Sequence, residues 1–342
     1  MRWLILILGV VALAGCAVFE QTPEDVQQKL NQPTKGRLYE RDPLQDYLPR
    51  KLSGLTGMLI IHSPRCLDYA AEGHPKNPER VRTAVAALEE SDHVWLVPDP
   101  CDETDILRVH TPAHLAAVKT GRFFDADTPF FPDIYEIARL AAGGAILAAE
   151  KALTTEPAFS LMRPPGHHAE RDRVMGFCYL NNIAIAVAKM VSQQRAQRAA
   201  ILDFDCHHGN GTEEIFLGNE RVLFASLHQS PCYPGTGLIA HGNCLNYPLP
   251  PGTGPHAFLE AVDDVLEQIR AFSPQLLAVS AGFDTYKCDP ITDMALEIET
   301  YHEIGARVVA YTRPASVPCF AVLEGGYSKD FALCVASFVS AW

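Results

Sequence analysis

Residues 201–212, ILDFDCHHGNGT, place several side chains that can bind a metal ion directly after an apolar run. If this run is a strand that continues through the segment, the alternation of side chains places Asp203, Asp205 and His207 on one side of the sheet. A carboxylate and an imidazole two residues apart can then bind the same divalent ion. Uncompensated buried charges cost roughly several kcal/mol, so a hydrophobic core does not explain this row. The segment predicts a metal site, and the alternative is a polar loop beside a sheet.

Similar polar clusters follow three other apolar runs. RPPGHH at 163–168 follows the run at 159–162, SAGFD at 280–284 ends the run at 276–281, and LEGGY at 323–327 ends the run at 320–323. In open parallel sheets, ligands bind beyond the carboxyl ends of the strands, where the loops converge. We therefore expect these four clusters to form one pocket.

The elements that must position these clusters alternate along the chain. Short apolar runs predict buried strands, and longer segments with apolar residues at three-to-four spacing predict helices. The expected strands are 58–62, 159–162, 199–205, 222–228, 276–281 and 320–323, and the expected helices are 78–91, 134–153, 181–192, 257–272 and 295–311. This alternation predicts a three-layer α/β/α domain with a mostly parallel sheet covered on both faces.

The bulk composition narrows the possible partners. The chain has 342 residues, of which 48% are hydrophobic, and a formal charge of −13 from 28 basic and 41 acidic residues. This content is enough for a large globular core. The acidic balance argues against a nucleic-acid partner, which would need a basic surface. It says nothing about the oligomeric state.

The first residues form a separate segment. Arg2 precedes an apolar run at 3–14, and Leu13-Ala14-Gly15-Cys16 follows the pattern of a bacterial lipoprotein signal. We predict a signal peptide at 1–15, a lipidated Cys16, a polar tether at 16–56 and a folded domain at 57–342. The protein would then be exported and anchored by lipid, facing the periplasm from the outer membrane. An ordinary signal peptide or an uncleaved anchor are the alternatives. The other cysteines show no paired spacing, so we expect most to be buried thiols.

Six motifs in order resemble the signature series of the zinc-dependent histone deacetylase family, which includes bacterial acetylpolyamine amidohydrolases. They are RPPGHHA, GFCYLNN, LDFDCHHGNGT, SLHQSPCYPGTG, SAGFD and LEGGYS. The resemblance spans residues 57–340. It implies the arginase-like α/β fold of that family and hydrolysis of an amide bond.

The resemblance also implies the ions of the site. Zinc would be bound by Asp205, His207 and Asp284, with iron(II) as the alternative ion. A structural potassium ion would lie near Asp203, Ser226 and Leu227. A second monovalent site near 216, 222 and 247 is a weaker match.

Catalytic roles follow from the same motifs. His167 and His168 resemble the paired histidines of the family, with His168 as base and acid, and the partners of the two imidazoles would be Asp203 and Asn210. Tyr327 would donate a hydrogen bond to the developing oxyanion. The walls of a narrow substrate channel would be Gly176, Phe177 and Tyr233. His74 either borders this pocket or is an ordinary loop histidine.

The expected reaction is removal of an acetyl or short acyl group from an acylated amine, such as acetyl-lysine or an acetylpolyamine. Ile291 stands where a polyamine-selective branch of the family has a glutamate, so this route to polyamine selectivity is absent. Two alternatives remain. An arginase-like hydrolase would bind two metal ions, and a non-catalytic receptor would bind acylated amines through a zinc pocket.

Overall fold

The computed structural model describes residues 58–154 and 156–342. The predicted signal peptide, Cys16 and the tether all lie outside the described residues. Within them, no helix is both long enough and apolar enough to cross a bilayer. All described cysteines are free thiols and most are buried, as expected.

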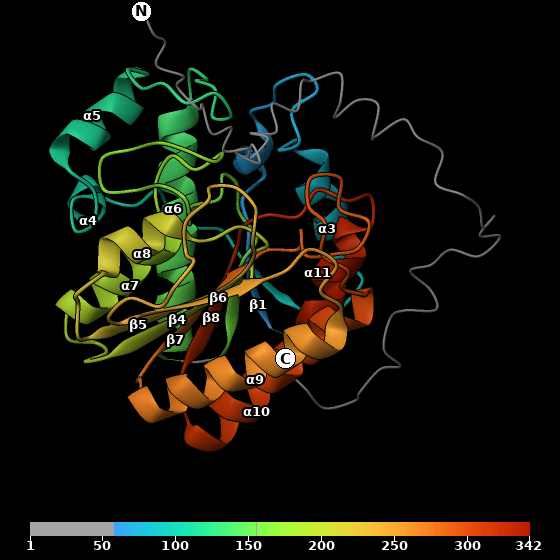
Figure 1. Cartoon of the computed structure of the whole chain (residues 1–342). Helices are drawn as coiled ribbons and strands as arrows, with labels where there is room; N and C mark the ends of the chain where they lie inside the picture. The colour runs from blue at the N-terminus through green and yellow to red at the C-terminus, as the bar shows by residue number, and fades with distance from the viewer. Residues whose placement is uncertain (1–57, 155) are drawn as a thin grey trace, which may run out of the picture.

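An eight-stranded sheet forms the centre of the fold, and all its strand pairs are parallel. The strand order is β2-β1-β3-β8-β7-β4-β5-β6 (Figure 1). The bounds are β1 Leu59–Ile61, β2 Val94–Leu96, β3 Ala158–Ser160, β4 Ala199–Asp203, β5 Val222–Gln229, β6 Cys244–Leu249, β7 Leu277–Ala281 and β8 Cys319–Leu323. Each predicted strand run overlaps one of these strands. The two edge strands, β2 and β6, were not predicted because their side chains are only partly buried and lack a continuous apolar run.

Helices cover both faces of this sheet (Figure 1). One layer contains α4 Glu103–Ile106, α5 Pro112–Thr120, α6 Ile134–Ala152, α7 Asn182–Ser192 and α8 Asn210–Phe216. The other contains α3 Glu79–Glu89, α9 Pro255–Phe272, α10 Ile298–Ala315 and α11 Phe331–Val339. A short 3-10 helix, η1, spans Pro64–Leu67. The three-layer α/β/α prediction is confirmed.

Two hydrophobic cores lie between the sheet and these layers. β4, β7 and β8 are buried along their whole length, because helices pack against both of their faces. On the side of α9, α10 and α11, the ring of Phe338 packs against Phe204 and Phe283 with centroids 5.4 and 6.0 Å apart. This packing makes the sheet a rigid support for the loops at its carboxyl edge.

Candidate active site

The predicted site residues gather at the carboxyl edge of four neighbouring strands. They come from the end of β4 and from the loops after β3, β4, β7 and β8, which are adjacent in the sheet. The residues brought together are His167, His168, Asp203, Asp205, His207, Asp284 and Tyr327. The prediction that the four clusters form one pocket therefore agrees with the structure.

The backbone at the metal group differs from the expected strand. β4 ends at Asp203, so strand alternation does not position Asp205 and His207 on this face. Instead, the backbone N–H of Asp205 donates to Asp203 Oδ1 at 3.0 Å, and that of His207 donates to Asp205 Oδ1 at 2.9 Å. Such side-chain acceptors compete with the sheet ladder and turn the chain. The prediction that strand alternation continues beyond Asp203 was therefore wrong, although Asp205 and His207 still reach the same site as Asp203.

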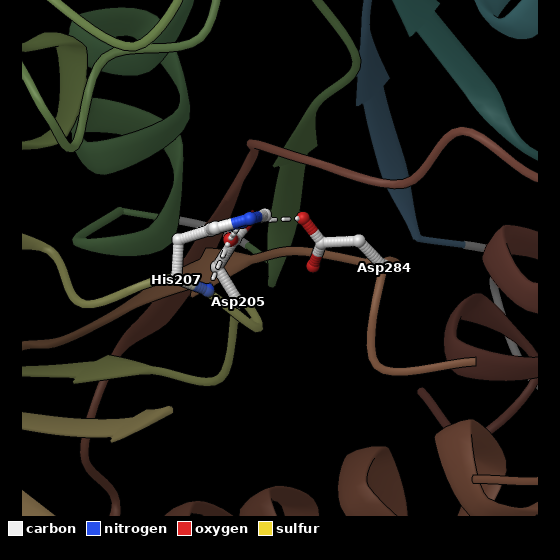
Figure 2. Close-up of side chains that lie close together, drawn as sticks. All are labelled: Asp205, His207 and Asp284. Carbon is white, nitrogen blue, oxygen red and sulfur yellow. Dashed lines mark hydrogen bonds and ion pairs between the residues drawn. The ribbon is translucent and has the colours of Figure 1, made fainter. Parts of the chain in front are cut away.

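Asp205, His207 and Asp284 form a group suited to a metal ion. One ligand atom from each lies within 4.8 Å of the others, and all three side chains are buried. His207 Nδ1 lies 3.0 Å from Asp284 Oδ2 and 3.2 Å from Asp205 Oδ1 (Figure 2). Burial and the charge of Asp205 raise the pKa of Asp284, although the hydrogen bond with His207 opposes this shift. Two carboxylates and an imidazole fit a divalent ion such as zinc, because these are its usual ligand types.

Backbone donors and glycines hold the two carboxylates in place. Gly325 N–H donates to Asp205 Oδ2 at 2.7 Å, and Cys206 N–H donates to Asp284 Oδ1 at 2.8 Å. A Cβ on Gly282 would lie 2.1 Å from Asp205 Oδ2, and a Cβ on Gly325 would lie 2.2 Å from Asp284 Oδ2. Only glycine therefore fits at these two positions.

The two histidines of the pair have different partners. His167 Nδ1 lies 3.0 Å from Asp203 Oδ2, and His168 Nδ1 lies 2.7 Å from Asn210 Oδ1. The amide nitrogen of Asn210 donates to Glu170 Oε1 at 2.8 Å, so its oxygen must face His168. His168 Nδ1 consequently carries the proton, and Nε2 is left as the basic nitrogen. Glu170 was missed in the sequence because no local motif joins it to Asn210.

These partners separate the pKa values of the two imidazoles. Burial and the neighbouring positive charges of His167 and His207 hold the pKa of His168 well below its usual value. Burial also opposes the charged form of His167, but the carboxylates of Asp205 and Asp203 outweigh it and raise its pKa to about 10. A cation bound by Asp205 would offset part of this carboxylate charge. The pair thus contains one neutral base and one imidazole suited to holding charge.

Tyr327 lies on the loop after β8 and remains a neutral donor. Its backbone N–H donates to Asp289 Oδ2 at 2.7 Å, which fixes the loop behind Gly326, whose φ is +108°. Burial and the carboxylate of Asp284 raise the pKa of the phenol well above its usual value. The guanidinium carbon of Arg80 lies 5.0 Å from the ring centroid, an arrangement that sequence reasoning missed.

A cavity of about 850 Å³ opens above these groups. Its walls include Gly176, Phe177 and Tyr233, as expected, and it also contacts His74 and Ile291. The ring of Phe177 lies 5.9 Å from that of Tyr327, and the ring of Tyr233 lies 5.2 Å from that of His168. His74 packs on Phe177 at 4.7 Å, so it belongs to the pocket wall. The cavity can admit an elongated group between aromatic walls.

Glu324 is a further residue of the site that sequence reasoning did not assign. Its Oε2 accepts the backbone N–H groups of Gly166 at 2.7 Å and His167 at 3.2 Å, and its Oε1 accepts the hydroxyl of Ser280 at 3.1 Å. The carboxylate thereby ties the loop after β3 to β7 and β8. Glu324 lies within the LEGGYS motif, and this position could have marked it as a residue of the site.

The residues expected near potassium are neighbours in the sheet. Asp203 of β4 pairs in register with Ser226 of β5, and Leu227 follows it. Asp203 Oδ2 is already bonded to His167, and the hydroxyl of Ser226 lies 3.0 Å from His228 Nδ1. Potassium binding at this place remains a prediction.

Comparison with known proteins assigns the family. The histone deacetylase domain model matches residues 74–342. A probable deacetylase of Archaeoglobus fulgidus is 40% identical over 80% of this chain and 82% of its own length. A histone deacetylase-like amidohydrolase of Pseudomonas aeruginosa is 38% identical, over 77% of this chain and 74% of its own.

A solved structure of a related protein has a similar fold. The acetylpolyamine aminohydrolase from Burkholderia pseudomallei superimposes with a TM-score of 0.76 at 30% identity, covering 83% of this chain and 98% of that one. The chain belongs to the histone deacetylase family, a family of deacetylases and amidohydrolases, and this membership supports a hydrolase.

Proposed function

We propose that the protein is a zinc-dependent deacetylase that removes an acetyl or short acyl group from an acylated amine. One observation carries this proposal: the metal group of Asp205, His207 and Asp284 lies beside a neutral His168 whose basic nitrogen is free. A histidine oriented in this way suits transfer of a proton to and from a reacting group.

The ion would be held by Asp205, His207 and Asp284, with iron(II) as the alternative to zinc. When bound, such an ion polarises a carbonyl and lowers the pKa of water towards about 7. A potassium ion near Asp203, Ser226 and Leu227 would add positive charge behind the histidine pair.

The chain's own residues supply the remaining chemistry. His168 Nε2 accepts the proton of the attacking water and later donates it to the leaving amine. His167, bonded to Asp203, carries positive charge beside the reacting centre. Tyr327 donates a hydrogen bond to the carbonyl oxygen as negative charge develops there. Phe177 and Tyr233 contact the linear part of the substrate and exclude branched groups.

The substrate class is a small acylated amine or an acetylated peptide. The similarity to an acetylpolyamine aminohydrolase supports the first of these. Ile291 lines the cavity, so this position offers no carboxylate to a second ammonium group, although Glu72, Asp127 and Asp293 also line the cavity. The signal peptide would export the protein, and lipidation of Cys16 would attach it to the outer membrane facing the periplasm, which separates it from chromatin. Loss of membrane attachment in Cys16→Ser, measured by cell fractionation, tests this localisation.

Purified residues 17–342 provide the test of the activity. Metal content and acetate release from an acetyl-lysine peptide and from acetylated polyamines are measured, with Tyr327→Phe as the control. We expect one zinc per chain and turnover that the control loses. Zinc without turnover would instead support a receptor, and two metal ions per chain would support an arginase-like hydrolase.

A further inference from the structure

Two buried imidazoles lie directly beneath the loop that carries Tyr233. This loop, residues 230–243, joins β5 to β6 and is called the channel loop here. His208 follows the metal-binding His207 in the chain, and His228 lies near the end of β5. Their ring centroids are 4.7 Å apart, and both residues are almost completely buried. Neither takes part in the proposed reaction.

The imidazoles hold two adjacent residues of the channel loop. His208 Nδ1 lies 2.8 Å from Thr236 Oγ1, and His228 Nε2 donates to the carbonyl oxygen of Gly237 at 3.0 Å. A Cβ at Gly237 would lie 2.6 Å from the ring of His208 and 2.7 Å from that of His228. The loop backbone is therefore seated on both rings, three and four residues after Tyr233.

Each imidazole is fixed from its other side. His208 Nε2 lies 3.1 Å from Glu213 Oε2 in α8, and the same oxygen accepts the amide N–H of Asn246 in β6 at 2.6 Å. His228 Nδ1 lies 3.0 Å from the hydroxyl of Ser226 in β5. Each imidazole is thus held at both ring nitrogens, which fixes its orientation. The position of the channel loop therefore depends on the elements below it.

Tyr233 is the part of the loop that meets the substrate pocket. Its ring lies 5.2 Å from that of His168 and 6.2 Å from that of His207, and it lines the cavity. The side chain is 40% exposed. Side-chain packing therefore holds Tyr233 on one side only, and the backbone of the channel loop must fix the position of its ring.

We propose that His208 and His228 are positioning residues, which hold the channel loop so that Tyr233 forms the wall of the substrate channel and sets the affinity for the acylated amine. This inference rests on the proposed function. The two imidazoles act through Thr236, Gly237 and Tyr233 and do not touch the reacting atoms.

Thr236→Val tests the proposal, because it keeps the shape of the side chain and removes the partner of His208. Loss of one hydrogen bond corresponds to roughly a 3- to 10-fold change in an equilibrium constant. We expect KM to rise by about this factor and kcat to stay within about twofold. Thr236→Ser should restore KM. His228→Leu, which removes the bond to Gly237, should raise KM in the same way.

Thr312→Val is the control, since the Thr312 hydroxyl likewise makes a hydrogen bond, to Val308 O inside α10, although Thr312 is buried and Thr236 is exposed. It should leave KM and kcat unchanged. A double-mutant cycle with Tyr233→Ala adds a sharper test, because Thr236→Val should have no further effect on KM once the tyrosine ring is gone. A fall in kcat at constant KM, or a full effect of Thr236→Val without the ring, would overturn the proposal.

Hydrogen exchange separates this inference from the proposed function. Exchange at 230–243 should rise in Thr236→Val and not in Thr312→Val, whether or not the protein is a deacetylase. Failure of the wild-type chain to release acetate would overturn the proposed function alone. Unchanged exchange in Thr236→Val would overturn the positioning role alone.

Discussion

Gly325→Ala is expected to damage the metal group without unfolding the protein. The φ of Gly325 is not in the left-handed region, so alanine meets no backbone strain there. Its Cβ, however, would lie 2.2 Å from Asp284 Oδ2 and 2.5 Å from Asp205 Oδ2. Carbon and oxygen rarely approach closer than about 3.3 Å, so the Asp284 oxygen would have to move by about 1 Å.

A movement of this size is large for a metal ligand. Ligand distances in metal sites hold to about 0.2 Å, and changes next to the ligands typically cost about 10- to 100-fold in affinity. Because two ligands are displaced together, we expect the upper end of this range, which is about 100-fold weaker zinc binding. Inserting one methyl group into a packed site costs about 1–3 kcal/mol, which a domain of this size tolerates.

Zinc affinity is measured by competition with a chelator of known affinity, together with acetate release and the melting temperature of the metal-free protein. Gly254→Ala is the matched control, because nothing lies within 4 Å of its added Cβ and its φ is −93°. If Gly325→Ala bound zinc as tightly as the wild type, the steric reasoning would be refuted.

Three further predictions concern the same site. Tyr327→Phe should lower kcat by about 10²- to 10³-fold with little change in melting temperature, since only the hydroxyl donor is lost; wild-type rates would exclude the oxyanion role. Asn210→Asp should move the rise in rate to higher pH. A carboxylate there favours the protonated form of His168 and raises its pKa, whereas the base must be unprotonated to act; an unshifted or lower midpoint in the pH-rate profile would contradict this. Removing the metal with a chelator should abolish acetate release and lower the melting temperature, because an ion at 1,000 times its Kd stabilises the fold by about 4 kcal/mol; recovery on adding zinc but not magnesium is the check.

Most of the sheet and the place of the site could be predicted from local sequence. The interior strands are short apolar runs, because helices cover both of their faces and, apart from Leu59 in β1, every side chain is buried. The polar clusters that follow these runs must then lie at the carboxyl edge. The edge strands β2 and β6 could not be found in this way, since their partly exposed side chains produce no such run.

The details of the site depended on contacts that no local pattern contains. Asp205 and His207 were expected on a strand, but backbone N–H groups bonded to the preceding carboxylates turn the chain after Asp203. The hydrogen bond from Gly325 to Asp205 joins residues 120 positions apart. Glu170, which orients the amide of Asn210, is separated from it by 40 positions.

The sequence by itself determined the alternation of strands and helices, the carboxyl-edge location of the site and the kinds of side chain that meet there. These follow from burial and strand direction, which each short segment expresses on its own. Only the tertiary structure decided which oxygen faces which nitrogen, why Gly325 must lack a side chain, and how His208 and His228 support the channel loop. Those contacts exist only once β4, β5, β7 and β8 lie side by side, because each joins residues that the chain alone keeps far apart.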